Sequence, residues 1–171
     1  MKKHCFLICL AVLLTFSLTA CGVKDFDISA AAEEILSTRS LSGGLRFSSA
    51  PKSEEVSRLD DDLIRSYFGD AADVPDFTKV ANYELYIDES KPTLPCEFGI
   101  FELSDESYAE TFILYLKARI DLKIENAKMY PSVDTETLKS AKFTVQGKYV
   151  WYVVIKGENA AVDDLLTGKT R

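Results

Sequence analysis

The sequence predicts an α+β fold, in which an antiparallel sheet of about four strands is packed by a long central helix and by shorter flanking helices. Three observations support this fold class. The chain has 171 residues, which is enough for one ordinary domain. Its apolar residues recur at helical spacing in some segments and alternate with polar ones in others. The expected order is helix, helix, strand, strand, long helix, strand, strand, helix, without the regular alternation of parallel βαβ units.

Two short helices are expected at the start of the domain. Asp27 is placed to cap a helix over residues 28–36, where apolar side chains recur every three or four positions. Residues 37–53 are rich in Ser and Gly, which predicts a loop. A second helix is expected from residues 56–67, and the acidic run at 60–62 suits its first turn because carboxylates favour a helix N-terminus.

Two strands are expected next. Residues 81–88 alternate between apolar and polar side chains, which is typical of a half-buried strand. Residues 89–95 contain two prolines and predict a loop, and residues 96–103 form a second strand. The apolar side chains of this strand change parity midway, so we expect a bulge near Gly99. Cys96 is expected to be a small, buried apolar residue.

The C-terminal half predicts a long helix, a hairpin and a short helix. Residues 104–130 carry a broad apolar face and no turn signal before residue 126. Two extended runs, 142–145 and 148–156, flank a short link that contains glycine, which favours a hairpin. The second run is apolar on both parities, so it is expected to be a central strand. A final helix over 159–166 is expected to stop at Gly168.

Residues 1–20 have the pattern of a lipoprotein signal peptide. Lys2 and Lys3 form a short basic start, and residues 5–18 form an uncharged apolar run. This run is shorter than the roughly 20 residues that a membrane-spanning helix needs. Residues 18–21, Leu-Thr-Ala-Cys, are similar to the lipobox of bacterial lipoproteins. The similarity implies cleavage before Cys21, lipidation of its sulfur, and an extracytoplasmic position on the cell membrane.

Such processing would leave 171 − 20 = 151 residues, with a lipidated tether at 21–26 and a single α+β domain at 27–171. His4, the one histidine, would be removed, and Cys96 would be the one free thiol. We therefore expect no enzyme of the Ser-His-Asp or Cys-His kind, no metal site and no cofactor. The formal net charge of −7 argues against nucleic acid as a partner, because such proteins carry a basic stripe.

The chain also resembles a family of small bacterial lipoproteins that carry a domain of unknown function, found mainly in clostridia-like Gram-positive bacteria. The resemblance rests on the lipobox, on Glu-Phe-Gly-Ile-Phe at 97–101 before the long helix, on Pro131, and on Gly-Lys-Tyr-Val-Trp-Tyr-Val-Val at 147–154. It covers roughly residues 55–165 of the domain. It implies a membrane-anchored domain that faces outward, and it implies no catalytic residues.

Three functions remain open from the sequence. The favoured one is a non-enzymatic interaction module that binds a protein partner in the cell envelope, because an anchor and a short tether come without a catalytic constellation. The second is a carrier of a peptide, sugar or lipid, held between sheet and helices by aromatic side chains, namely Tyr83, Tyr86, Tyr108, Tyr115 and Trp151. The third is a cell-wall glycan hydrolase that uses two carboxylates.

Overall fold

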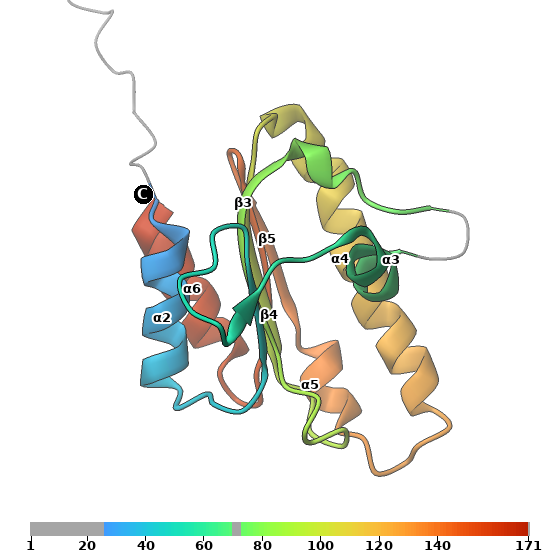
Figure 1. The fold of residues 1–171 in the computed structure, drawn as a ribbon. Coiled ribbons are helices and arrows are strands. Elements are labelled where there is room, and N and C mark those ends of the chain that lie inside the picture. The colour runs from blue at the N-terminus through green and yellow to red at the C-terminus, as the bar shows by residue number, and fades with distance from the viewer. Residues whose placement is uncertain (1–25, 70–72, 171) are drawn as a thin grey trace, which may run out of the picture.

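The computed structural model describes residues 26–69 and 73–170. The expected signal peptide, the lipidation site Cys21 and the tether up to residue 25 lie outside the described residues. Within this part of the chain the fold is mixed α and β, as predicted from the sequence, and it has three layers. A sheet lies between a pair of helices on one face and a second group of helices on the other (Figure 1).

The described residues form one sheet of six strands, so the expectation of about four was too low. The strands lie in the order β2-β1-β3-β4-β6-β5, and all neighbours are antiparallel except β1 and β2. Their bounds are β1 Leu45–Ser48, β2 Val56–Ser57, β3 Val80–Ile87, β4 Glu97–Leu103, β5 Lys142–Gln146 and β6 Tyr149–Val154.

The helices divide between the two faces of the sheet (Figure 1). On one face, α2 packs on β3 and β4, while α6 packs on β5 and β6. On the other face, α4 packs on β5 and β6, and α3 and α5 pack against α4. Their bounds are α2 Ile28–Thr38, α3 Asp61–Phe68, α4 Ala109–Ala127, α5 Thr135–Lys139 and α6 Asn159–Thr170, with short 3₁₀ turns at Phe77–Lys79 and Glu106–Tyr108.

The central strands β4 and β6 are buried on both faces because helices cover both sides of the sheet. This arrangement explains the change of parity in β4, since Phe98 and Ile100 face α2 and α6 while Phe101 and Leu103 face α4. The expected bulge near Gly99 is therefore wrong, because the register of β4 runs unbroken through that residue on both sides. The register shift lies instead in β3, between Val80 and Asn82.

Gly99 has a different role, because its missing side chain makes room for two aromatic rings. A Cβ atom at this position would lie 2.7 Å from both the Phe101 and the Tyr152 ring. Such a distance is shorter than carbon atoms in contact adopt, so the close packing of this face requires glycine.

The N-terminal half differs most from the sequence-based expectation. Strand β1 lies inside the expected loop, and β2 takes the first residues of the expected second helix. Helix α3 begins only at Asp61, where the side chain of Asp60 accepts a hydrogen bond from the Leu63 amide at 2.8 Å. The cap expected at Asp27 is confirmed, since its side chain accepts from the Ala30 amide at 2.9 Å, and the acidic run at 60–62 lies at a helix N-terminus as expected.

The C-terminal hairpin is confirmed, and Gly147 supplies the positive φ of +59° that its two-residue turn requires. Helix α5 was not expected, and α6 continues through Gly168 to Thr170. Trp151 on β6 is fully buried, and its indole nitrogen donates to Asp163 of α6 at 2.9 Å. This contact ties α6 to the middle of the sheet.

Candidate functional site

The five aromatic residues that the sequence suggested as a ligand platform do not come together. Tyr83 and Tyr108 belong to the core cluster on the α4 face, whereas Tyr86 and Trp151 belong to the cluster on the α2 and α6 face. Each of these four is at most 9% exposed. Tyr115 lies apart from both clusters, half-buried on α4. Because the sheet separates the two clusters, these side chains build the core and line no common pocket.

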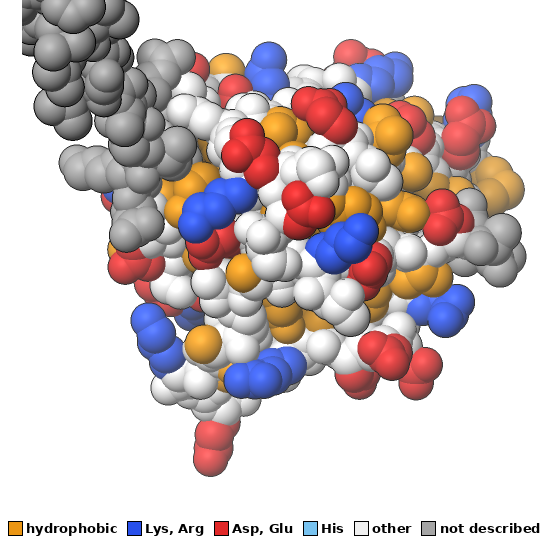
Figure 2. All heavy atoms as spheres, turned by 90° about the horizontal axis from the view of Figure 1, so that it is seen from above, with side chains coloured by type: hydrophobic (Ala, Val, Ile, Leu, Met, Phe, Trp, Pro, Cys, Tyr) orange, Lys and Arg blue, Asp and Glu red, His pale blue; other side chains and the backbone are white. Residues whose placement is uncertain are grey.

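The outer side of α4 exposes apolar side chains that the sequence placed in the core or left unassigned. Leu114 is 60% exposed and Leu122 is 56% exposed, and Ala118 lies exposed between them. Seen from above, hydrophobic side chains show among interspersed acidic and basic ones, mainly over the half of the molecule that holds α3 and α4 (Figure 2). Exposed apolar groups in one place are typical of a binding surface.

Two adjoining hollows follow α4 along its length, and together we call them the α4 groove. The larger one has a volume of about 490 Å³ and lies between α3 and α4, and the smaller one, of about 240 Å³, lies between α4 and the β3–β4 loop. Lys123 and Asn126 line both hollows, so the two are neighbours along α4. The apolar lining of the groove consists of Tyr67, Phe68, Leu114, Tyr115, Ala118 and Leu122 in the larger part, and Pro92, Pro95, Cys96, Tyr130, Val133 and Leu138 in the smaller.

A buried ionic cluster forms the floor where the two parts of the groove meet. Glu97, at the start of β4, is 1% exposed and accepts hydrogen bonds from Arg119 at 2.6 Å and from Lys123 at 2.8 Å. The side chain of Arg119 is 7% exposed, and that of Lys123 is 36% exposed. The two cations are four residues apart, so one face of α4 directs both toward the same carboxylate.

Arg119 also joins α3 to this cluster. It donates to the backbone carbonyl of Tyr67 at 2.8 Å, and its guanidinium lies 5.0 Å from the centre of the Tyr67 ring and 5.6 Å from that of Phe68. Guanidinium groups are attracted to the faces of aromatic rings at these distances. Arg119 therefore fixes the wall of the groove as well as its floor.

The two cations also control the protonation of Glu97. Burial by itself would raise the pKa of this carboxyl, but the charges of Arg119 and Lys123 outweigh burial and hold its pKa below the usual value. A carboxyl whose pKa is lower in the folded chain than in the unfolded chain stabilises the fold above the unfolded pKa. This stabilisation is lost as the pH falls through the folded pKa.

We expect the Glu97→Gln variant to be much less stable than the wild type at pH 7 and closer to it at pH 3. At low pH the wild-type carboxyl becomes protonated and loses its charge. The amide of the variant is uncharged at every pH, so the two chains come to resemble each other. Urea unfolding of both chains at the two pH values measures the difference. A difference in stability that is equal at both values would contradict this linkage.

Cys96 lies half-buried at the smaller end of the groove. Burial, followed by the charges of Asp88 and Glu97, raises the pKa of its thiol to about 11. The thiolate is the nucleophilic form of cysteine, and it is scarce at neutral pH when the pKa is this high. Cys96 thus serves the groove as a wall residue. It packs against the core cluster of the α2 and α6 face but is only half-buried, whereas the sequence predicted a buried side chain.

Sequence reasoning missed the ionic floor, although signals for it exist. Glu97 is the one charged residue in the otherwise apolar segment 96–101. Arg119 and Lys123 have the spacing that places two side chains on one helix face. What the sequence could not indicate is that these two elements meet, because β4 and α4 are brought together by packing of the helix on the sheet.

The described residues contain no group of three or more His, Cys, Asp or Glu side chains placed to hold a metal ion. A search of the same residues finds no helix with the length and apolar character that crossing a bilayer requires. Comparison of the chain with protein-family models, with curated proteins and with solved structures gives no match. The description of the chain therefore rests on its own architecture. Its described residues form a sheet of six strands between helical layers, with the α4 groove on one side.

Proposed function

We propose that this protein is a lipid-anchored, extracytoplasmic interaction module that holds a segment of a partner protein of the cell envelope in the α4 groove. The observation that carries the proposal is the pair of exposed leucines, Leu114 and Leu122, which line the larger hollow together with the buried Arg119. The lipobox ending at Cys21 supports the anchored position. The resemblance to clostridia-like lipoproteins supports the same location, and the proposed role is non-enzymatic.

The shape of the groove favours an amphipathic helix as the bound segment. Leu114 and Leu122 are eight residues apart, which is about 12 Å along a helix axis. A helix laid in a groove presents apolar anchors at intervals of three, four and seven residues, which suits this separation. The polar floor at Lys123 favours a polar residue of the partner between its anchors. Since the chain has a net charge of −7, basic flanks on the partner give charge complementarity.

The position of the groove suits a partner that approaches an anchored domain. The chain enters the fold at Asp27, the cap of α2, and α2 belongs to the layer on the opposite face of the sheet from α3 and α4 (Figure 1). An anchor joined through residues 21–26 therefore attaches to the layer of α2 and α6. The helical layer that holds the groove is left for the partner.

Photo-crosslinking in intact cells tests this proposal. A photoreactive amino acid in place of Leu122 is expected to link the protein to one envelope protein, at a peptide with apolar residues at helical spacing. The same amino acid in place of Ala161, an exposed residue of α6 on the other layer, is the matched control and is expected to give no such product. Mass spectrometry of the product identifies the linked peptide.

A second probe in place of Ala118, which also lines the groove, is expected to give the same product. Adding Leu114→Glu and Leu122→Glu to that chain is expected to reduce the crosslink at least tenfold, because two buried carboxylates without partners oppose docking. Both leucines are exposed, so the fold itself is expected to tolerate the change. Leu45→Glu alters an exposed leucine that does not line the groove, and it controls for general loss of apolar surface. Equal crosslinking from positions 122 and 161, or a product that links two copies of this chain, would refute an envelope partner at this groove.

A further inference from the structure

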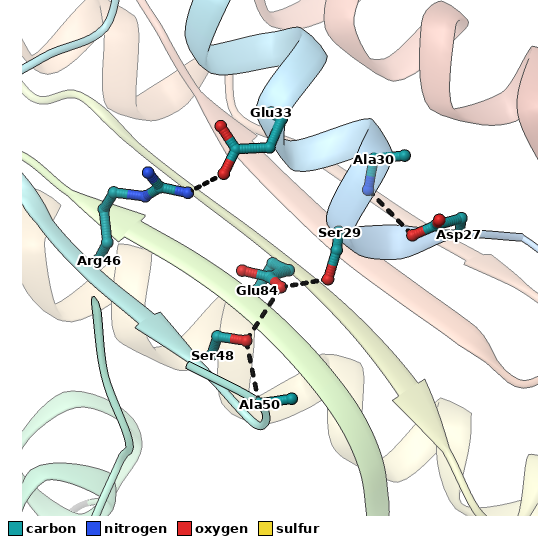
Figure 3. A network of polar contacts seen from close by, with 8 residues as sticks. All are labelled: Asp27, Ser29, Ala30, Glu33, Arg46, Ser48, Ala50 and Glu84. Atoms are coloured by element: carbon teal, nitrogen blue, oxygen red, sulfur yellow. Dashed lines mark hydrogen bonds and ion pairs between the residues drawn. The ribbon is translucent and has the colours of Figure 1, made fainter. Parts of the chain in front are cut away.

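A further hollow, of about 350 Å³, lies on the other face of the sheet, where the first turn of α2 faces β1 and β3 (Figure 3). Helix α2 packs on β3 and β4, and the apolar cluster between this helix and the sheet includes Tyr86 of β3. Next to Tyr86, the same face of the sheet carries Arg46, Ser48 and Glu84. Ser48 pairs with Glu84 across the two strands, and Arg46 lies two residues before Ser48, so the three side chains point to one side. The volume lies at the lower end of the range for small-molecule sites.

Glu84 is the central residue of this hollow, and it is 91% buried with 9% of its surface exposed. One carboxylate oxygen, Oε1, accepts a hydrogen bond from Ser29 of α2 at 2.5 Å and another from Ser48 of β1 at 3.0 Å (Figure 3). The Ser48 hydroxyl itself accepts from the Ala50 amide at 3.1 Å, so its proton is directed at Glu84. The carboxylate is thus held in place by donors from two other segments of the chain, α2 and β1.

The other oxygen of Glu84, Oε2, has no hydrogen-bond donor among residues 26–69 and 73–170. None of the ion pairs in that part of the chain includes Glu84. The contrast with Glu97 is clear, since Glu97, which is 1% exposed, has two cations. A buried carboxylate without a cationic partner is costly to a fold, and the cost is relieved when a cation binds.

Side chains of both signs line the rest of the hollow, the acidic Asp27 and Glu33 and the basic Arg46 and Lys52. Arg46 forms an ion pair with Glu33, whose side chain is 63% exposed (Figure 3). An exposed ion pair is worth little, so Arg46 can exchange Glu33 for an anionic group of a ligand at small cost. The hollow therefore offers an acceptor for a cation at its base and donors for an anion at its entrance.

We propose that this hollow binds a small zwitterion that carries a primary ammonium group, with the ammonium on Glu84 and the anionic group at Arg46 and Lys52. A primary ammonium has three N–H donors, which suit the free oxygen of Glu84 and the serine oxygens around it. Two sources share this chemistry, a free amino acid and a phosphoethanolamine headgroup. The inference does not depend on the α4 groove, which lies on the opposite face of the sheet.

Isothermal titration of the full chain, kept soluble in a mild non-ionic detergent, tests the proposal. L-alanine and O-phosphoethanolamine are the two probes, and at least one is expected to bind saturably with a Kd below about 10 mM, which is weak binding on the scale of free energies. Propionate lacks the ammonium, and O-phosphocholine carries a quaternary ammonium that cannot donate a hydrogen bond. Both are expected to bind at least tenfold more weakly than their amine counterparts.

The Glu84→Gln variant is expected to weaken binding of the active probe at least tenfold, because it removes the charge and keeps the shape. Glu34→Gln is the matched control, since Glu34 lies on α2 outside the hollow and pairs with Lys169. Thermal unfolding checks that both variants are folded. Binding of alanine alone identifies amino acids, and binding of phosphoethanolamine alone identifies the headgroup. No saturable binding of either probe, or equal binding by Glu84→Gln, would overturn the proposal.

Discussion

Replacing Arg119 with methionine is expected to lower the free energy of unfolding by about 3–5 kcal/mol, the range for breaking a buried ion pair on one side. The substitution leaves Glu97 almost fully buried with Lys123 as its one remaining cation. It also removes the hydrogen bond to the Tyr67 carbonyl that holds α3 against α4. Urea unfolding at pH 7, followed by the fluorescence of Trp151, measures the loss.

Two further variants separate charge from packing in this cluster. The double variant Glu97→Leu and Arg119→Met is expected to recover much of the lost stability, because an apolar pair replaces the buried ionic one and Lys123, which is 36% exposed, reaches solvent. Lys117→Met changes an exposed residue of the same helix and is expected to shift stability by less than about 0.5 kcal/mol. An Arg119→Met variant as stable as Lys117→Met, or a double variant less stable than either single one, would contradict the role of this pair.

Replacing Cys21 with alanine is expected to abolish acylation of the protein and to release it from the membrane fraction. Each acyl methylene buried in the bilayer contributes about 0.8 kcal/mol, so two chains give stable attachment and their loss removes it. Incorporation of a labelled fatty acid is expected to fall to background, and the released protein is expected in the soluble fraction. Mass spectrometry of the N-terminal peptide of the wild type is expected to place a diacylglyceryl group on residue 21.

Cys96→Ala is the matched control for this experiment, because it removes the one thiol that the structure describes. It is expected to leave labelling and membrane attachment unchanged. Continued labelling of Cys21→Ala, or a wild-type protein whose N-terminus is still Met1, would contradict lipidation at this site. This outcome would remove the membrane anchor from the proposed function and leave the α4 groove and the Glu84 hollow to their own tests.

Local patterns predicted those elements whose signals are contained in a short segment. Asp27 caps a helix as its position indicated, the acidic run at 60–62 lies at a helix N-terminus, and the alternation over residues 81–88 marks β3 within one residue. The hairpin of β5 and β6 follows from two extended runs and a glycine between them. In each case the deciding interactions, a cap, a turn or a run of apolar residues, lie within a few positions of one another.

Elements that depend on distant partners were not predicted. Strand β1 has four residues, and it is a strand because it pairs with β3 some forty positions later, at pairs such as Phe47 with Leu85. Strand β2 has two residues and depends on β1 in the same way. Such short segments carry too few side chains for periodicity to show. Leu122 belongs to the segment 104–130, whose spacing predicted a broad apolar face, yet its side chain is 56% exposed.

The sequence by itself determined the kinds of structural elements and most of their order, the expected lipobox at Cys21, and the absence of histidine beyond residue 4. Tertiary structure alone decided that Glu97 meets Arg119 and Lys123, that Glu84 is enclosed without a cation, and that the leucines of α4 remain uncovered. The physical reason is that burial and ion pairing are properties of positions in space. Two residues acquire them when the packing of a helix on a sheet brings distant segments into contact.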